Sequence, residues 1–366
     1  MAKDLMTNEK YTYDSLSKKY YDFKVPTYKI NIDGSELTEE KSTIITELKV
    51  ELTCDNEASG CQFMVMGVYN PSKRAFDKSL VTKYFQLGKK VTVSLGYIKT
   101  EMVFMGYISA VTTSIGAEMA MISVECTDAK GLMMNNQVIE QRTETKYKDV
   151  ISSILSSNSY GSYSAGTQVD DIETPQKKIE IYGESDFDFL VRLANRVNYE
   201  FFVCQGKIFF RKPMPLKSPV LELEWGMNLL GFEKRCSLEG QVLELEVRST
   251  DIDKGAVISG IAKSDEQFSN GPSGKKALKK IKKVIVDSSI ISEQEATKRA
   301  EELLKRLNER YTQVQIKCVG IPEIVPGRFI KVKKLGEGLE GNYYIIRVVH
   351  SVSSEEYSTT IEARMA

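Results

Sequence analysis

Short runs of alternating apolar and polar residues recur along most of this 366-residue chain, and they restrict it to a mainly β fold. Alternation with a period of two places every second side chain on the same face of a sheet. Turn-forming pairs such as Asp33-Gly34 and Asn70-Pro71 separate the runs, as in an antiparallel barrel or sandwich. We therefore predict a first β-barrel domain over residues 25–134, built from the runs YKINID, TIITELKVELT, CQFMVMGVY, KVTVSLGYI, VFMGYISAV and AMISVECTD.

The β pattern returns in the C-terminal part of the chain and is interrupted once. LELEW, NLLGFEKRCS and QVLELEVRS come before the interruption, and TQVQIKCVG, GRFIKVKK, NYYIIRVVHSVS and YSTTIEARM come after it. We assign residues 225–252 and 312–366 to a second β-barrel domain. The interruption, residues 253–311, combines a lysine-rich polar stretch with a helix that begins at Ser292, where Glu295 completes a capping box.

Residues 135–224 lack this alternation and predict a small α+β domain. Within them, Tyr182–Lys212 reads as one helix followed by one hairpin. Ser185 can cap the helix, with Asp188 three residues later in the reciprocal position. Helix capping and solvation account for the acidic residues of this stretch, so we assign them no chemistry. The apolar stripe of the helix consists of Phe187, Leu190, Val191, Ala194 and Val197.

Length and composition describe a folded protein with several domains. At 366 residues the chain exceeds the usual size of one core, so we expect two or three domains. Fifty basic and fifty acidic residues cancel, which argues against a dedicated nucleic-acid binder. No stretch approaches the ~20 apolar residues that span a bilayer, and no apolar run typical of a secretory signal lies near the N-terminus. We therefore expect synthesis in the bacterial cytoplasm and no membrane insertion.

Two segments provide candidates for partner contacts. Residues 1–24 are polar and tyrosine-rich with no sustained period, so they form either an ordered N-terminal arm or a disordered tail. The lysine-rich part of the insertion could contact an acidic partner surface or nucleic acid, or remain a solvated loop. The candidate contact residues are Tyr11, Tyr13, Tyr20, Tyr21, Lys275, Lys276, Lys279 and Lys280.

The sequence offers no residues that we assign to catalysis, to a cofactor or to a metal. Because His350 is the single histidine of the sequence, we predict neither a typical zinc site nor a His-based triad. The run from Gly336 to Gly341 has the spacing of a dinucleotide loop, but a strand-like segment rather than a helix follows it. The six cysteines include no CxxC pair and are expected to be reduced, with Cys54 and Cys61 the nearest pair for a disulfide.

Three phrases, in order along the chain, resemble the late control gene D proteins of phages and the VgrG spike proteins. The first is Phe104-x-Gly106-x-Ile108 with Asp128. The second is Glu184-Ser-Asp186-Phe-Asp-Phe-Leu190-x-Arg192-Leu-Ala194 with the hairpin Tyr199-Glu-Phe-Phe. The third joins Pro326-Gly327-Arg-Phe-Ile330 to Gly341-Asn-Tyr-Tyr344-Ile-Ile-Arg-Val348-Val-His350. One departure is Phe187, which stands where these proteins usually carry Trp.

The resemblance implies a baseplate hub protein of a contractile injection system, with a structural role and no enzyme activity. Its fold would be mainly β, with two tail-tube-like antiparallel β-barrel domains flanking a small α+β domain. Three chains would form a homotrimer, whose pseudo-sixfold ring adapts the tail tube to the central spike. The alternative function is a tail-associated cell-wall hydrolase.

The resemblance also implies partners and a location. The spike domain of VgrG does not follow Ala366, so the spike is expected to be a separate protein. Further expected partners are the tail tube protein, baseplate wedge proteins and a tape-measure protein. The particle that contains them could be a phage tail, a tailocin or another injection machine.

Overall fold

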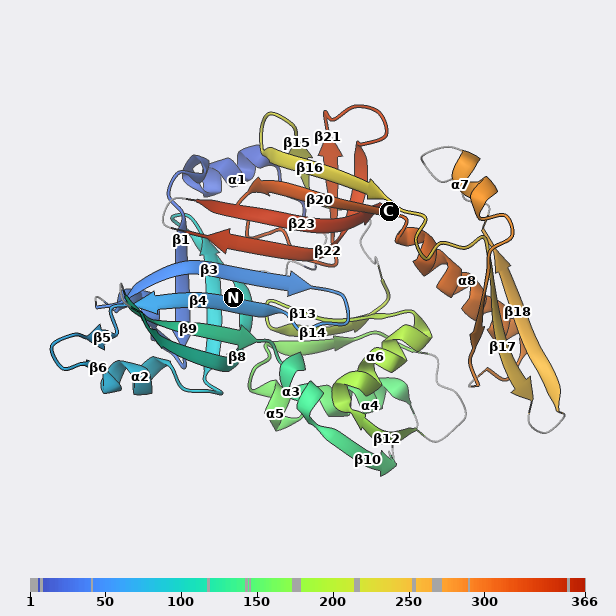
Figure 1. Ribbon diagram of the computed structural model, residues 1–366, viewed down its shortest axis with the longest axis horizontal. Helices are drawn as coiled ribbons and strands as arrows, with labels where there is room; N and C mark the ends of the chain where they lie inside the picture. Colours follow the sequence, from blue (N-terminus) through green and yellow to red (C-terminus); the bar gives the residue numbers. More distant parts are fainter. Residues whose placement is uncertain are drawn as a thin grey trace.

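The fold is mainly β, as predicted, and consists of a curved sheet, a small α+β unit and an insertion that carries one long helix (Figure 1). The computed structural model describes residues 6, 9–40, 42–116, 119–141, 144, 146–172, 179–213, 218–251, 255–264, 272–288, 290–353 and 356–365. Within these ranges, no helix combines the length and the apolar composition that crossing a membrane requires.

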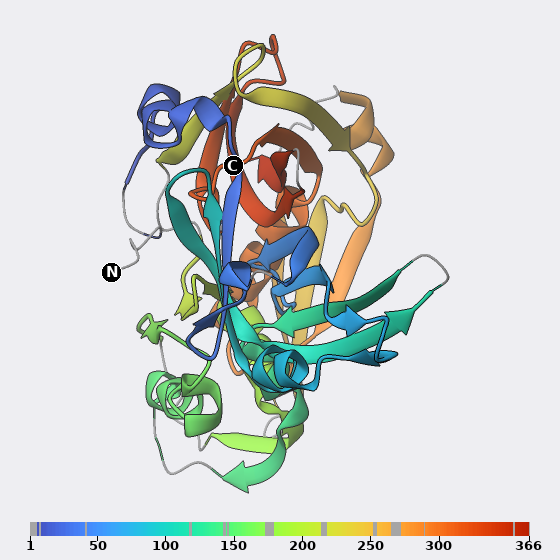
Figure 2. The ribbon, with the colours of Figure 1, turned by 90° about the vertical axis from the view of Figure 1, so that its left-hand side faces the viewer.

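The N-terminal half of the curved sheet contains the strands that alternation predicts in residues 25–134. Val50, Phe63 and Val93 are among the side chains that this alternation buries completely. The strands are β1 (Thr27–Ile32), β2 (Ser35–Glu36), β3 (Ile44–Thr53), β4 (Gly60–Met66), β7 (Lys90–Gly96), β8 (Thr100–Ile115) and β9 (Ala120–Thr127). Short elements between them are η2 (Leu37–Glu39), β5 (Tyr69–Asn70), β6 (Ala75–Phe76) and α2 (Lys78–Tyr84). The ends of β8 and β9 project from the body as a long hairpin (Figure 2).

The C-terminal half of the sheet follows the same principle. Its strands are β15 (Pro219–Glu224), β16 (Leu229–Cys236), β20 (Thr312–Val319), β21 (Phe329–Lys333), β22 (Gly341–Val352) and β23 (Tyr357–Met365). In β20 every second residue is buried, as the alternation predicts. β15 was predicted within the α+β domain, but it pairs in parallel with β21 and so belongs to the sheet.

The two β units are halves of one continuous sheet, because β22 pairs with β3. Their antiparallel partners run from Arg347 opposite Thr53 to Val352 opposite Leu48. β22 is long enough to pair with β21 through its first residues and with β3 through its last ones. The strand order is β16-β20-β23-β22-β3-β4-β9-β8-β7-β1-β2, and one hydrophobic core extends across the junction. The sheet curls around that core rather than forming two separate closed barrels.

The α+β unit packs below the sheet in the view of Figure 1. It contains α3 (Lys130–Asn135), β10 (Gln137–Gln141), α4 (Tyr147–Leu155), α5 (Asn158–Gly161), β11 (Gly166–Val169), β12 (Glu180–Ser185), α6 (Asp186–Val197), β13 (Glu200–Cys204) and β14 (Lys207–Arg211).

Local signals in the sequence set the ends of α6. The predicted cap is confirmed, since Ser185 Oγ accepts the Asp188 N–H at 3.0 Å. Asn198 ends the helix with a left-handed backbone at φ 55°. Leu190 and Leu193 are buried on its inner face, and each such side chain contributes roughly 1.5–3 kcal/mol to stability. The predicted stripe omitted Leu193, and it included Val197, which is only half-buried.

The insertion is a separate small layer of sheet and helix on the right of Figure 1. Its strands β17 (Glu244–Asp251), β18 (Ala256–Lys263) and β19 (Lys282–Val286) form a three-stranded sheet, beside α7 (Pro272–Ala277) and α8 (Glu293–Glu309). The first strand was predicted in the second barrel, but among the described strands it pairs with β18 and β19 and with no strand of the large sheet. It buries Leu245 and Val247 under α8 instead. Gly260 permits this contact, because a Cβ there would lie 2.1 Å from the Thr297 nitrogen.

Candidate interaction surfaces

The N-terminal arm docks on its own chain through α1 (Tyr13–Lys19) and the turn η1 (Tyr21–Phe23). Tyr20 is fully buried, and its hydroxyl donates to Glu323 Oε1 at 2.7 Å. Burial and the Glu323 charge raise the pKa of Tyr20 far above its usual range. Lys19 Nζ lies 2.6 Å from Glu101 Oε1 and 2.7 Å from Glu323 Oε1. Tyr20 was predicted as a partner contact, but it is an internal anchor of the arm.

The other three tyrosines of the arm differ in what they display. Tyr11 donates its backbone N–H to the Val220 carbonyl at 2.8 Å and is half-buried. Tyr13 stacks on Phe23 with ring centroids 5.5 Å apart. Only Tyr21 is largely exposed, at 60%. Of the four, Tyr21 is therefore the one best placed to contact another protein.

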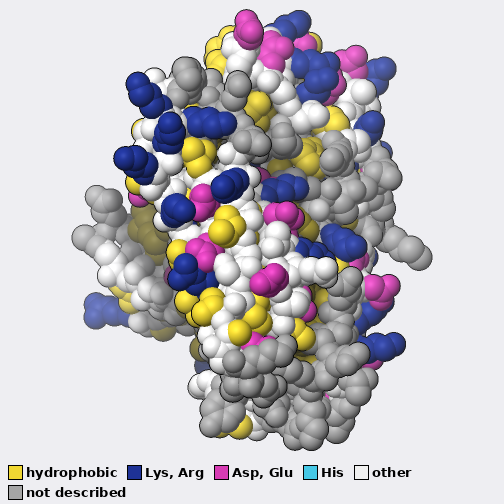
Figure 3. Space-filling view, turned by 90° about the vertical axis from the view of Figure 1, so that its right-hand side faces the viewer, with side chains coloured by type: hydrophobic (Ala, Val, Ile, Leu, Met, Phe, Trp, Pro, Cys, Tyr) yellow, Lys and Arg dark blue, Asp and Glu magenta, His cyan; other side chains and the backbone are white. Residues whose placement is uncertain are grey.

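The predicted lysine cluster is exposed. Lys275, Lys276, Lys279 and Lys280 all lie on or just after α7, at the surface of the insertion. Figure 3 shows the side of the molecule that carries the insertion, where basic side chains gather toward one edge and apolar ones lie among charges below them. The four lysines are accessible to an acidic partner surface.

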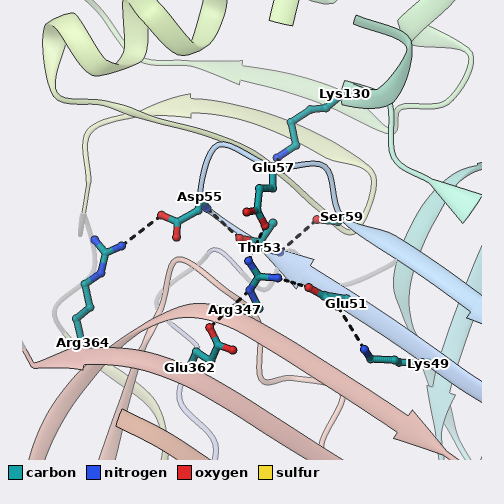
Figure 4. Close-up of polar contacts among 10 residues, drawn as sticks. All are labelled: Lys49, Glu51, Thr53, Asp55, Glu57, Ser59, Lys130, Arg347, Glu362 and Arg364. Carbon is teal, nitrogen blue, oxygen red and sulfur yellow. Dashed lines mark hydrogen bonds and ion pairs between the residues drawn. The ribbon is translucent and has the colours of Figure 1, made fainter. Parts of the chain in front are cut away.

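The joint between the two halves of the sheet carries a cluster of charges centred on Arg347 (Figure 4). Its Nη2 lies 2.5 Å from Glu57 Oε2, its Nε lies 3.6 Å from Glu362 Oε2, and it also pairs with Glu51. Burial lowers the pKa of Arg347, but the carboxylates of Glu57 and Glu51 outweigh it and the net shift is upward. The cluster joins β22 and β23 to β3 and to the β3–β4 turn.

A buried polar pair supports that turn from below. Asp128 and Lys130 are both fully buried. Asp128 accepts the Ser59 N–H at 2.9 Å and the Lys130 N–H at 2.8 Å. Lys130 Nζ donates to the Glu57 carbonyl. Burial raises the pKa of Asp128 and lowers that of Lys130. Asp128, singled out by its family phrase, thus fixes the β3–β4 turn to the end of β9.

A third joint holds the α+β unit against the sheet. Arg211 on β14 is buried, and its Nη2 donates to the Gly327 carbonyl at 2.7 Å and to Glu200 Oε2 at 3.3 Å. The Tyr344 hydroxyl donates to the other oxygen of Glu200 at 2.5 Å. Burial raises the pKa of Glu200 although Arg211 opposes it. Gly327 has φ +79°, and a Cβ there would lie 2.4 Å from Arg211 Nη2, so the Pro-Gly phrase is a packing requirement.

His350 and the glycine-rich run from Gly336 to Gly341 have structural roles. His350 is buried and bonds Thr359 Oγ1 at 3.1 Å and the Tyr357 hydroxyl at 3.0 Å. Burial lowers its pKa to about 4. The glycine-rich run connects the antiparallel strands β21 and β22, as the loop interpretation predicts. No group of three or more His, Cys, Asp or Glu side chains within the described ranges could hold a metal ion.

The cysteines are one further class of reactive side chain, and the adjacent acidic residues Glu39-Glu40, Asp170-Asp171 and Glu355-Glu356 are another. All six cysteines belong to the described ranges and are free of disulfides, Cys54 and Cys61 included. Asp170 accepts the Lys212 N–H at 3.1 Å, and Asp171 pairs with Lys148 at 2.6 Å. Of the pair Glu355-Glu356, Glu355 lies outside the described residues.

One exposed apolar surface was not predicted. Trp225, the only tryptophan, is 52% exposed in the connection between β15 and β16, and Met227 and Leu230 beside it are each 50% exposed. We call these three residues the Trp225 patch. Buried Asn228 holds the turn, accepting the Glu224 N–H at 2.7 Å. The sequence carried a signal for this surface, namely large apolar residues on both sides of a turn glycine, because turns are usually polar.

Of the comparisons with known proteins, those with solved structures bear on the fold. A family model described as Alg8 N-terminal domain matches residues 22–354, and its description mentions neither late control gene D proteins nor VgrG. No curated protein matches the chain. The structure is similar to a 43 kDa tail protein of prophage MuSo2 from Shewanella oneidensis, with a TM-score of 0.72 and 16% identity over 92% of this chain and 98% of that one.

Two further structures have a similar fold. A tail protein from Neisseria meningitidis MC58 gives a TM-score of 0.68 and 13% identity over 93% of this chain and 96% of that one. A component of the type VI secretion system of Escherichia coli, described as similar to tail proteins of bacteriophage T4, gives 0.58 and 11% over 92% and 77%. At such identities the likeness is one of fold.

Proposed function

We propose that this chain, which belongs to the family described as the Alg8 N-terminal domain, is a structural subunit of the tail baseplate of a phage or phage-like injection machine. The observation that supports this most is the fold, which matches tail proteins over nearly the whole length of both chains. The polar groups in the interior join one part of the molecule to another.

Within the baseplate the chain acts as a hub. Three copies form a homotrimer, in which six sheet halves make a pseudo-sixfold ring between the tail tube and the threefold spike. The sheet supports this arrangement because each chain supplies two halves of one continuous, mostly antiparallel sheet. The sheet is also open, because β16, β2 and β15 each pair with only one neighbouring strand of the described residues. A free strand edge tends to pair with another strand, and a closed ring of identical subunits satisfies every such edge.

The exposed surfaces are the contacts to other tail proteins. The Trp225 patch provides an aromatic anchor, the residue type most enriched at energetically important positions of interfaces. The lysine cluster on α7 offers positive charge to an acidic partner. The partners are the spike protein, the tail tube protein, the baseplate wedge and the tape-measure protein.

Mass photometry of the purified chain, alone and mixed with the tube and spike proteins of its particle, tests the hub. We expect trimers, either in the chain alone or on addition of the spike. A monodisperse monomer that binds neither protein would overturn the proposal. A muropeptide-release assay on the same sample tests the alternative function of a tail-associated cell-wall hydrolase. Cleavage of the cell wall would assign the chain to the hydrolases.

A further inference from the structure

A pocket of about 250 Å³ lies where three parts of the molecule meet. The large sheet contributes the β3–β4 turn and strands β22 and β23, the α+β unit contributes the end of α6, and the insertion contributes β19 and α8. The position of the insertion on the body therefore determines the shape of the pocket.

Positive charge predominates in the pocket wall. The basic residues are Lys283, Lys305, Arg306, Arg310 and Arg364, and the acidic ones are Asp55, Glu200 and Glu309. Glu200 already accepts hydrogen bonds from Arg211 and from Tyr344, at the contact between the α+β unit and the sheet. The charge that Glu200 could offer to the pocket is thus used elsewhere, which leaves a marked excess of cationic groups.

The excess of positive charge is clearest around Arg306. It is half-buried, and its Nη1 donates to the amide oxygen of Asn195 at 3.1 Å. Among the described residues no carboxylate lies within ion-pair distance of Arg306, and of its charged neighbours only Glu309 is negative. Burial lowers the pKa of Arg306 from its ordinary value, and three nearby cations lower it further: Arg299, Arg310 and Arg364.

Arg364 approaches the same space from the sheet. It extends from β23 toward Asp55, with Nη2 and Oδ1 3.4 Å apart (Figure 4). Its Nε is buried and has no hydrogen-bond partner among the described atoms. A buried donor of a charged group without a partner is costly, and it marks a place where an acceptor would be stabilised.

We propose that this pocket binds one small oxyanion of the phosphate class, held by Arg306, Arg310 and Arg364. Guanidinium groups present paired N–H donors in the geometry that phosphate oxygens accept. The bound anion relieves the repulsion among the arginines, which come from α8 and its C-terminal cap and from β23. It thereby links the insertion to the large sheet and stabilises one position of the insertion on the body.

Isothermal titration calorimetry with inorganic phosphate tests this on the full chain, with sodium chloride at equal ionic strength as the reference. We expect saturable binding at one site and a higher midpoint of thermal unfolding in phosphate. Arg306→Gln and Arg310→Gln should each weaken binding about tenfold or more, the loss expected when a charged hydrogen-bond donor is removed. Arg310 is exposed, so its variant folds even if Arg306→Gln does not.

The matched control is Arg74→Gln, which removes an exposed arginine in the turn between β5 and β6. It should leave the affinity for phosphate unchanged. Equal effects of phosphate and chloride, or equal weakening by Arg74→Gln, would overturn the site because both indicate general screening of charge. Tighter binding of acetate than of phosphate would overturn the assignment to the phosphate class.

Discussion

The Tyr20 hydroxyl donates a hydrogen bond to Glu323 Oε1 at 2.7 Å, and both side chains are buried. Lys19 Nζ lies 2.7 Å from the same oxygen, so one carboxylate atom receives two donors from the arm. This contact ties the N-terminal arm to the segment between β20 and β21. The sequence leaves open whether residues 1–24 are ordered, and the contact orders their second half on their own chain.

Tyr20→Phe should destabilise the protein while preserving the packing of the ring. Glu323 stays buried with one donor fewer, so the free energy of unfolding should fall by about 1–2 kcal/mol. Urea denaturation measures this. The control Tyr21→Phe alters an exposed ring and should change stability by less than about 0.5 kcal/mol. Equal losses in the two variants would contradict the anchoring role of Tyr20.

Gly327→Ala should be more harmful than an alanine at another glycine with positive φ. At Gly327 a Cβ meets Arg211 Nη2 at 2.4 Å, whereas at Gly226 it meets nothing within 4 Å, although φ is +83° there. We expect losses of about 3 kcal/mol or more at Gly327 and roughly 1 kcal/mol at Gly226. The comparison by chemical denaturation isolates the contacts of the added Cβ with Arg211 and with Phe202 Cζ, 3.1 Å away, and similar losses would remove these contacts as the cause.

Stability should fall between about pH 6.5 and pH 4 because of His350. Its folded-state pKa is lowered from 6.5 to about 4, so in acid the unfolded chain binds a proton that the folded chain does not. The stabilisation is complete above pH 6.5 and is lost as the pH falls, by about 2 kcal/mol at pH 5. His350→Gln should lack this part of the pH dependence in urea denaturation at pH 7 and pH 5. An unchanged difference between the two pH values would show that other groups cause it.

Trp225→Ala should weaken assembly without weakening the fold. The side chain is 52% exposed, and the turn beneath it is held by Asn228. We expect a change in unfolding free energy of less than about 1 kcal/mol but a loss of about tenfold or more in the affinity between subunits or for tail partners. Sedimentation equilibrium measures both affinities. Ile139→Ala, at another exposed apolar residue, serves as the control and should assemble normally.

Features that depend on neighbours in the sequence could be predicted, and those that depend on distant contacts could not. The cap of α6 at Ser185 and the alternation of β20 are local, so the residues themselves specify them. The strand that contains Leu245 has the same alternation whether α8 or the large sheet covers it, so sequence could not show that it belongs to the insertion.

The partners of the charged residues that connect the parts of the molecule could not be predicted from the sequence either. Glu302 and Arg306 have the i,i+4 spacing of a surface ion pair on a helix. In the structure Arg306 turns instead to Asn195 on α6 and lines the pocket. The partners of Arg347 lie up to 296 residues away, beyond the reach of any local pattern.

The pairing of β22 with β3 also imposes an order on synthesis. A ribosome adds roughly 5–20 residues per second, so β3 leaves it well before its partner on β22 exists. During that interval one edge of β3 carries unpaired N–H and C=O groups, which invite the edges of other nascent chains. The N-terminal half of the sheet therefore depends on β22, near the C-terminus of the chain, to complete the pairing of β3. A long delay in translation after β9 would favour aggregation over folding.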